Sequence, residues 1–221
     1  KNSKIFSVKR LYTSIMNTKI ILDLCGGTGA WSRPYQEAGY DVRIITLPQY
    51  DVRTYQPPKE VYGVLAAPPC TEFARCGARW WKKKSPDLLS QALTIVLACY
   101  NIAKTASGWW ALENPVGRLT QWLGPPNFKF QPWEFGDPWT KQTWLWGSFN
   151  TPQKIVGAIK PDISIPGHKN SQWRRTIQLE NRLIFGLPIN WIHQLGPSPN
   201  KAALRSITPP GFAQAFFAAN P

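Results

Sequence analysis

Short apolar runs that alternate with helical patterns constrain the fold of this chain more than any other feature of its sequence. Apolar runs rich in β-branched residues are typical of strands that are buried in a parallel sheet. When such strands alternate with helices, they indicate a parallel α/β sheet. The strands are expected at Lys19–Leu24, Val42–Leu47, Val61–Ala66, Trp109–Leu112 and Thr143–Phe149.

Three further segments are predicted to be helices. The first, Ser32–Ala38, is followed by a glycine, which commonly terminates a helix. The second begins at Ser85–Asp87, where a serine cap, a proline and an acid suit the start of a helix, and apolar residues then recur at helical spacing as far as Ile102. Gly211–Ala219 is predicted to be a closing helix.

The composition divides the chain into four regions. Residues 1–15 are mixed and basic and lack the apolar segment of a signal peptide, so a non-native or flexible extension is expected before Met16. Residues 16–115 carry the alternating pattern and are expected to form the catalytic core. Residues 116–205 are rich in Pro, Trp and basic residues and are expected to complete the sheet and contact nucleic acid, while 206–221 hold the closing helix.

The charge of the chain points to a polyanionic partner. It has 26 Lys and Arg against 12 Asp and Glu, a formal net charge of +14. An imbalance this large in 221 residues favours nucleic acid, and the 12 Trp offer faces on which bases stack. No run approaches the roughly 18 apolar residues of a membrane span, so no membrane partner is expected.

The four cysteines are predicted to be free thiols. They form no Cys-x-x-Cys pair, and the two histidines lie far from them in sequence, so no metal site is expected. Three of them sit in or beside predicted core elements, which disfavours a disulfide framework and indicates a reducing compartment. They are Cys25, Cys70, Cys76 and Cys99.

A glycine-rich turn, Asp23–Gly29, follows the first predicted strand and precedes the first predicted helix. Glycines allow the backbone to approach a ligand closely, and a helix N-terminus favours polar or anionic groups. A Walker phosphate loop is excluded, because no Gly-Lys-Ser/Thr follows. The turn therefore indicates a ligand site, with a tight turn that binds nothing as the alternative.

A cysteine lies just beyond a predicted strand, within Ala67–Phe73. Open α/β sheets bind ligands at this position, so Cys70 is a candidate nucleophile. Nearby cations are expected to lower the pKa of its thiol and to raise the thiolate fraction. A buried structural cysteine is the alternative, and Cys76 offers a second thiol. The cations that follow are Arg75, Arg79, Lys82, Lys83 and Lys84.

A carboxyl group lies at the end of the next predicted strand, in Ala111–Pro115. Adjacent strands of a parallel sheet lie roughly 5 Å apart, so Cys70 and Glu113 are expected to face one pocket. A nucleophile beside a carboxylic acid suits covalent attack on a ring whose nitrogen must be protonated or hydrogen-bonded. A solvated turn is the alternative interpretation of this segment.

In this order, the glycine turn, the Pro-Pro-Cys followed by Phe73 and the Glu-Asn pair resemble the DNA cytosine-5 methyltransferase family, most of all its compact versions encoded by phages. The resemblance implies a Rossmann-like S-adenosylmethionine-dependent methyltransferase sheet with helices on both faces, plus a small irregular basic region. It further implies S-adenosylmethionine as cofactor and DNA as substrate, either a duplex with a flipped cytosine or a single strand. The protein is expected to be a monomer and to lie in the cytoplasm, which is the host's cytoplasm if a phage encodes it.

The resemblance also implies roles for particular residues. Cys70 would add to C6 of cytosine, Glu113 would engage N3, and Lys141 would be the surviving cation of a later motif. The implied cofactor-binding residues are Asp23, Gly26, Gly27, Gly29, Trp31, Asp51 and Pro68. The implied DNA-binding residues are Arg75, Arg79, Lys82, Lys83, Lys84, Arg174 and Arg175.

The chain differs from the family pattern in several places. Glu-Asn is followed by Pro115 instead of valine, and the second predicted strand does not end in an acid. The family's Gln-x-Arg-x-Arg segment is reduced to Thr140–Thr143, with Gln172–Arg175 as a competitor for its role. Because a separate recognition domain is absent or much shortened, relaxed sequence specificity is predicted.

The sequence leaves two alternatives to this function open and disfavours a third. A non-catalytic DNA-binding relative and an RNA cytosine-5 methyltransferase remain open. A cytidine deaminase is disfavoured, because its His-x-Glu and second zinc-binding cysteine are missing: Cys70 is followed by Thr-Glu-Phe.

Overall fold

Six strands form one mixed sheet in the order β2-β1-β3-β4-β6-β5. In the computed structural model, which describes residues 19–137, 139–155 and 205–221, strands β1 to β4 are parallel. Strand β6 runs antiparallel to β4, and β5 antiparallel to β6. The strands are β1 (Ile20–Leu24), β2 (Asp41–Ile45), β3 (Gly63–Ala66), β4 (Trp109–Pro115), β5 (Phe128–Phe130) and β6 (Thr143–Ser148).

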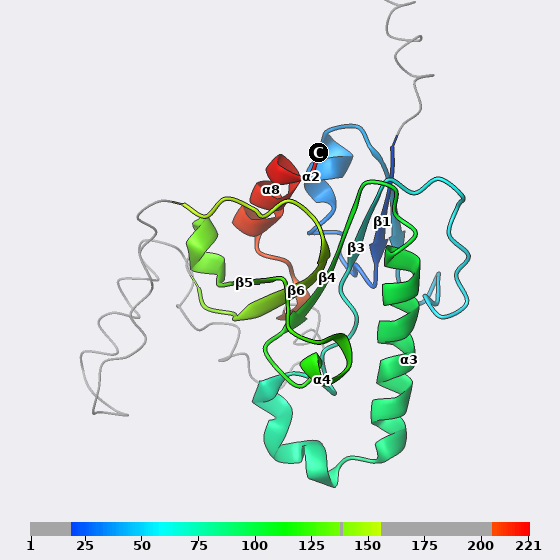
Figure 1. Cartoon of the computed structure of the whole chain (residues 1–221), viewed down its shortest axis with the longest axis vertical. Coiled ribbons are helices and arrows are strands. Elements are labelled where there is room, and N and C mark those ends of the chain that lie inside the picture. The colour runs from blue at the N-terminus through cyan, green and yellow to red at the C-terminus, as the bar shows by residue number, and fades with distance from the viewer. Residues whose placement is uncertain (1–18, 138, 156–204) are drawn as a thin grey trace, which may run out of the picture.

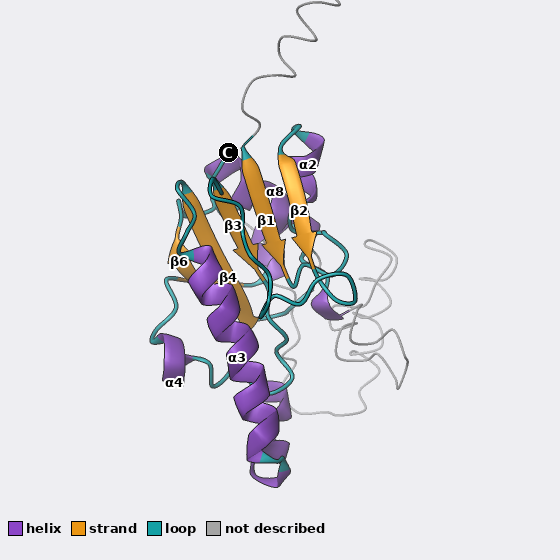
Figure 2. Ribbon diagram, turned by 90° about the vertical axis from the view of Figure 1, so that its right-hand side faces the viewer, coloured by secondary structure: helices purple, strands orange, loops and turns teal. Residues whose placement is uncertain are grey.

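Helices lie on both faces of this sheet. Helix α3 covers one face, and α2 and α8 cover the other (Figures 1 and 2). The described helices are α2 (Arg33–Glu37), α3 (Pro86–Ala103), α4 (Thr120–Leu123) and α8 (Pro210–Ala219), with 3-10 helices η1 (Arg75–Lys83) and η2 (Pro132–Phe135). The chain is thus an α/β protein whose arrangement is compatible with a Rossmann-like fold.

The period of two along each strand divides the core between these faces. Leu22 and Leu112 pack on the side of α3, where Cys99 and Ile102 are buried. The neighbouring Ile21 and the alternate positions of the other strands pack on the side of α2 and α8. Apolar residues therefore occupy both faces of the central strands, which is why those strands appear in the sequence as continuous apolar runs.

Most predicted elements are confirmed, with shifts at their ends. Strand β2 ends at Ile45, and Leu47 is 68% exposed, so the predicted end of that strand was too late. Strand β4 continues three residues beyond its predicted end because β6 pairs with it as far as Pro115. Glu113 therefore lies inside a strand, opposite Leu145, and not beyond the strand end.

The region after β4 adds two antiparallel strands to one edge of the sheet. Strand β5 was not predicted, because three residues are too few to show a period. The predictions for Gln172–Arg175, including Arg174 and Arg175, lie outside the described residues. None of the helices that the structure describes is long and apolar enough to cross a membrane.

Candidate active site

Two adjoining cavities lie where β1, β3 and β4 reach their carboxyl ends. Figure 2 shows the arrowheads of these parallel strands directed toward the same end of the sheet, the end where the strands finish. The smaller cavity has a volume of about 100 Å³ and the larger about 650 Å³. Four residues line both of them: Cys70, Pro115, Lys141 and Arg205.

The glycine turn after β1 borders the smaller cavity, and a buried acid anchors it. Asp23 is fully buried, and its Oδ2 accepts a hydrogen bond of 2.6 Å from Ser32 Oγ. A side chain at Gly26 would overlap the Asp23 carboxyl group, and Gly29 adopts a φ of 67°, so glycine is required at both positions. The turn thus brings the backbone against the carboxylate and leaves Asp23 Oδ1 without a hydrogen-bond partner among the described residues.

Burial raises the pKa of Asp23 to about 6, although the hydrogen bonds from Ser32 oppose the change. At neutral pH the group is therefore mostly ionised in a place where desolvation disfavours the charge. A buried carboxylate with one unpartnered oxygen suits a ligand that brings a cation or a hydrogen-bond donor.

This acid should make the folded protein less stable as the pH rises. Because the folded pKa of Asp23 is about 6 and its ordinary value is 3.8, its stabilising contribution is complete below pH 3.8 and is lost as the pH rises to about 6. The full difference corresponds to roughly 3 kcal/mol. Urea unfolding at pH 5 and pH 7.5 should show a smaller loss for Asp23→Asn than for the unchanged protein.

A second acid with a raised pKa and a control variant have to be considered in that measurement. Asp137 also has a pKa raised to about 6 by burial, so part of the pH dependence will persist in Asp23→Asn. The control is Asp41→Asn, which removes an exposed acid paired with Arg43. Equal pH dependence in Asp23→Asn and the unchanged protein would contradict the assignment.

Cys70 is held on the turn after β3 by contacts from two directions. Its carbonyl oxygen accepts hydrogen bonds from the backbone N–H groups of Phe73 and Ala74, at 2.9 and 2.8 Å. Asn114, fully buried in β4, donates from Nδ2 to the Pro68 carbonyl at 3.0 Å. Asn114 therefore fixes the Pro-Pro-Cys turn, and the cysteine side chain lines both cavities.

The expectation that the following cations activate this thiol was wrong. Burial, and secondly the charge of Glu113, raise the pKa of Cys70 above its ordinary value. The cations that oppose this rise are Lys141 and Arg205, not those of η1. The cations of η1 are exposed, and two of them, Arg79 and Lys83, lie over the ring of Trp80, whereas the Cys70 thiol is partly buried.

A carboxylate and an ammonium group face each other beside the thiol. Glu113 Oε1 in β4 lies 3.8 Å from Lys141 Nζ, on the segment that enters β6, and the side chains are only 15% and 12% exposed. Gln131 fixes that segment, since its Oε1 accepts a hydrogen bond of 2.9 Å from the Lys141 N–H. The antiparallel pairing of β4 and β6 thus brings together two groups that are distant in sequence.

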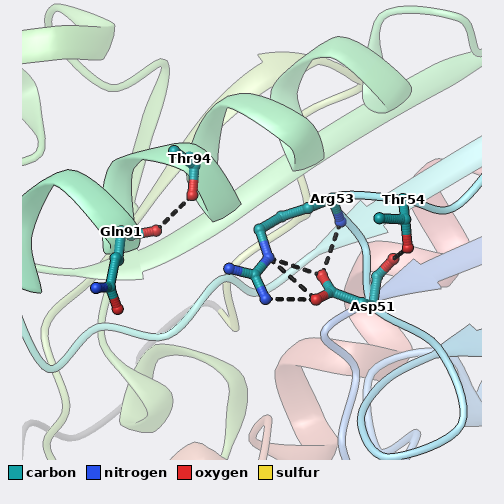
Figure 3. Close-up of polar contacts among 5 residues, drawn as sticks. All are labelled: Asp51, Arg53, Thr54, Gln91 and Thr94. Atoms are coloured by element: carbon teal, nitrogen blue, oxygen red, sulfur yellow. Dashed lines mark hydrogen bonds and ion pairs between the residues drawn. The ribbon is translucent and has the colours of Figure 1, made fainter.

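Of three other residues predicted to bind the cofactor, two line the smaller cavity and one does not. Pro68 lines the smaller cavity, and so does Trp31, whose ring packs against Phe216 at a centroid distance of 5.5 Å. Asp51 lies outside the linings of both cavities. Figure 3 shows its carboxylate directed at the Arg53 guanidinium, which accounts for a pKa lowered to about 2.

The predicted DNA-binding cations of the described chain lie on or directly after η1, which contributes Cys76 and Trp80 to the wall of the larger cavity. Arg75, Arg79, Lys82 and Lys83 are exposed on η1. The Arg79 guanidinium and the Lys83 ammonium lie 5.1 and 5.5 Å from the ring centre of Trp80, which lines the cavity. Lys84 also lines it and pairs with Glu72 at 2.7 Å.

Sequence reasoning missed Arg205. This residue precedes α8, lines both cavities and donates from Nη2 to Cys76 Sγ at 3.6 Å. Its position depends on how the C-terminal segment returns to the sheet, so no motif around it could have revealed it. Among the described residues, no group of three or more His, Cys, Asp or Glu could hold a metal ion.

No known family model matches the chain, and no curated protein is similar to it in sequence. The resemblance to cytosine-5 methyltransferases therefore depends on the motif residues alone.

Proposed function

We propose that the chain is a DNA cytosine-5 methyltransferase that uses S-adenosylmethionine. The observation that carries the proposal is that Cys70, Glu113 and Lys141 line the same small cavity as Asp23 and Gly26 of the glycine turn. A nucleophile, a carboxyl group and a cation thus adjoin a site with a buried acid. Covalent attack on a pyrimidine needs the first three, and a cationic methyl donor suits the acid.

The residues present fit the cofactor. Asp23 offers one unpartnered carboxylate oxygen, and the glycine turn brings backbone close to the cavity. A cavity of about 100 Å³ accommodates only part of such a molecule, since drug-sized ligands occupy roughly 300 to 1,000 Å³. Thr28 lines the cavity and is exposed, so the cavity opens to solvent at this residue. When bound, S-adenosylmethionine supplies an electrophilic methyl group.

The chemistry assigned to the chain follows from the positions of three side chains. The Cys70 thiolate adds to C6 of cytosine, and Glu113 hydrogen-bonds the protonated N3, so that the ring carries less charge when C5 becomes nucleophilic. Lys141 holds the Glu113 carboxylate and offsets its repulsion of the thiolate. After methylation, water takes the C5 proton, the electrons of the C5–H bond re-form the C5=C6 double bond, and the C6–S bond breaks to release the Cys70 thiolate. N3 returns its proton to Glu113, which restores the aromatic ring.

The test is incubation with radiolabelled S-adenosylmethionine and, in separate reactions, DNA or RNA, followed by nucleoside mass spectrometry. Label in 5-methylcytosine is the expected result. Label in RNA only would assign the chain to RNA cytosine methylation, and DNA binding without any label would make it a non-catalytic relative. A labelled group other than plain methyl would show as a different nucleoside mass.

Binding to DNA should weaken steeply with salt. A chain with a net charge of +14 displaces counterions from phosphates, and neutralisation of about four phosphates implies a loss of roughly 100-fold in affinity between 50 and 200 mM salt. Fluorescence anisotropy with a labelled duplex would measure it. Lys82→Ala should lower the slope of log K against log salt by about 1.

The matched control for Lys82 is Arg43→Ala, which removes an exposed cation already paired with Asp41 on β2. This variant should leave the slope unchanged. If affinity hardly changes with salt, or if both variants lower the slope equally, η1 is not the phosphate-binding surface.

A further inference from the structure

Two thiols connect the glycine turn to the helix on one face of the sheet. Cys25 lies in the turn and Cys99 in α3, and their Sγ atoms are 3.8 Å apart. Both are free thiols. Cys99 is fully buried, whereas Cys25 is partly exposed and lines the smaller cavity. A small oxidant in that cavity would therefore meet Cys25 first.

The pKa values of the two thiols are shifted in opposite directions. The hydrogen bond with Cys99 lowers the pKa of Cys25 below its ordinary value, although burial opposes this. The same contact, together with burial, raises the pKa of Cys99. Cys25 is thus the thiol of the pair with the lower pKa. Because the thiolate is the form that reacts with peroxides, the accessible member of the pair is also the reactive one.

We propose that Cys25 and Cys99 form a modification site for hydroperoxides, at which a disulfide between them distorts the glycine turn. The Cys25 thiolate attacks a peroxide oxygen, the O–O bond breaks, and Cys25 becomes a sulfenic acid while hydroxide leaves. The Cys99 sulfur then attacks the Cys25 sulfur and expels its oxygen as water, with its own proton. In sum, two thiols and one hydrogen peroxide give one disulfide and two waters.

The turn, and not α3, has to move when this bond forms. A disulfide holds two sulfurs much closer than 3.8 Å. Cys99 is fixed within the 18-residue helix α3 and in the core below it. Cys25 sits in a turn with a φ of 58° and is followed by Gly26, which contacts the Asp23 carboxyl group. A displacement of Cys25 toward α3 therefore changes the wall of the smaller cavity.

Peptide mapping of the oxidised chain tests the modification directly. The full chain is treated with hydrogen peroxide, alkylated with iodoacetamide and digested with trypsin without reduction. Each cysteine falls in a separate tryptic peptide: 20–43 for Cys25, 60–75 for Cys70, 76–79 for Cys76 and 85–104 for Cys99. A cross-link between 20–43 and 85–104 that dithiothreitol cleaves is the expected result. A cross-link between 60–75 and 76–79 in its place, or oxidation of all thiols without a cross-link, would overturn the proposal.

The effect on the cavity rests on the proposed function and has its own measurement. Equilibrium dialysis should show S-adenosylmethionine binding to the oxidised chain at least tenfold more weakly than to the reduced chain, with recovery after reduction. Cys99→Ala cannot form the cross-link, so peroxide should leave its affinity for S-adenosylmethionine unchanged. Cys25→Ala serves the same purpose if Cys99→Ala does not fold. A complete cross-link with unchanged affinity would overturn the distortion of the turn. If the reduced chain does not bind S-adenosylmethionine, the proposed function fails, while the peptide map still decides the thiol pair.

Discussion

Replacement of Cys70 by alanine is expected to abolish methyl transfer to cytosine, with a loss of at least about a thousandfold, because its thiol forms the bond to C6. The side chain lies at the junction of both cavities and its backbone is fixed by Phe73 and Ala74. Folding and S-adenosylmethionine binding should be largely unchanged. The measurements are single-turnover transfer of labelled methyl to DNA, thermal unfolding and equilibrium dialysis of the cofactor.

The matched control is Cys76→Ala, which removes an exposed thiol from the wall of the larger cavity. It should retain most of the activity. A DNA that contains 5-fluorocytosine gives a second readout, since fluorine at C5 blocks the elimination step and should trap the unchanged chain covalently. If Cys76→Ala is inactive and Cys70→Ala remains active, the assignment of the nucleophile is wrong.

Glu113→Gln is expected to separate the reactivity of the thiol from the rate of methyl transfer. The charge of Glu113 raises the pKa of Cys70, so glutamine should lower this pKa and speed the alkylation of Cys70 at pH 8. Methyl transfer should nevertheless fall by roughly 100- to 10,000-fold, because the variant cannot supply the proton or the charged partner that N3 needs. The two effects have opposite signs, which a general loss of structure would not produce.

Iodoacetamide labelling followed by tryptic mapping distinguishes the two thiols at this site, since peptides 60–75 and 76–79 report Cys70 and Cys76 separately. Glu37→Gln, at the exposed end of α2, controls for the loss of one negative charge. Faster alkylation of Cys70 together with unchanged or faster methyl transfer would show that Glu113 only shields the thiol and takes no part in the reaction.

The sequence predicted the elements that local pattern determines. The apolar runs of β1 and β3 and the Ser85-Pro86 start of α3 were placed within one or two residues, because side-chain period and capping are properties of a few consecutive residues. It also predicted that Cys70 and Glu113 would line one pocket, since neighbouring parallel strands finish at the same end of the sheet.

The pairing of strands was not local in this sense. Strand β4 is longer than its apolar run because Leu145 and Thr143 of β6 provide hydrogen-bond partners for residues up to Pro115. These partners of β4 come more than twenty residues later in the chain. The same contact brings Lys141 to Glu113, a position that the sequence could indicate only by resemblance.

What the sequence by itself determined is the alternation of strands and helices, the glycine turn after β1 and the thiol after β3, because each depends on residues that are adjacent in the chain. Only the tertiary structure decided the state of the groups in the site. Burial and Glu113 raise the pKa of Cys70 against the expectation from neighbouring cations. Arg205 reaches the cavities through the return of the C-terminal segment, and Cys25 meets Cys99 across 74 residues. Electrostatic interactions act over distance in space, and the distance along the chain does not determine them.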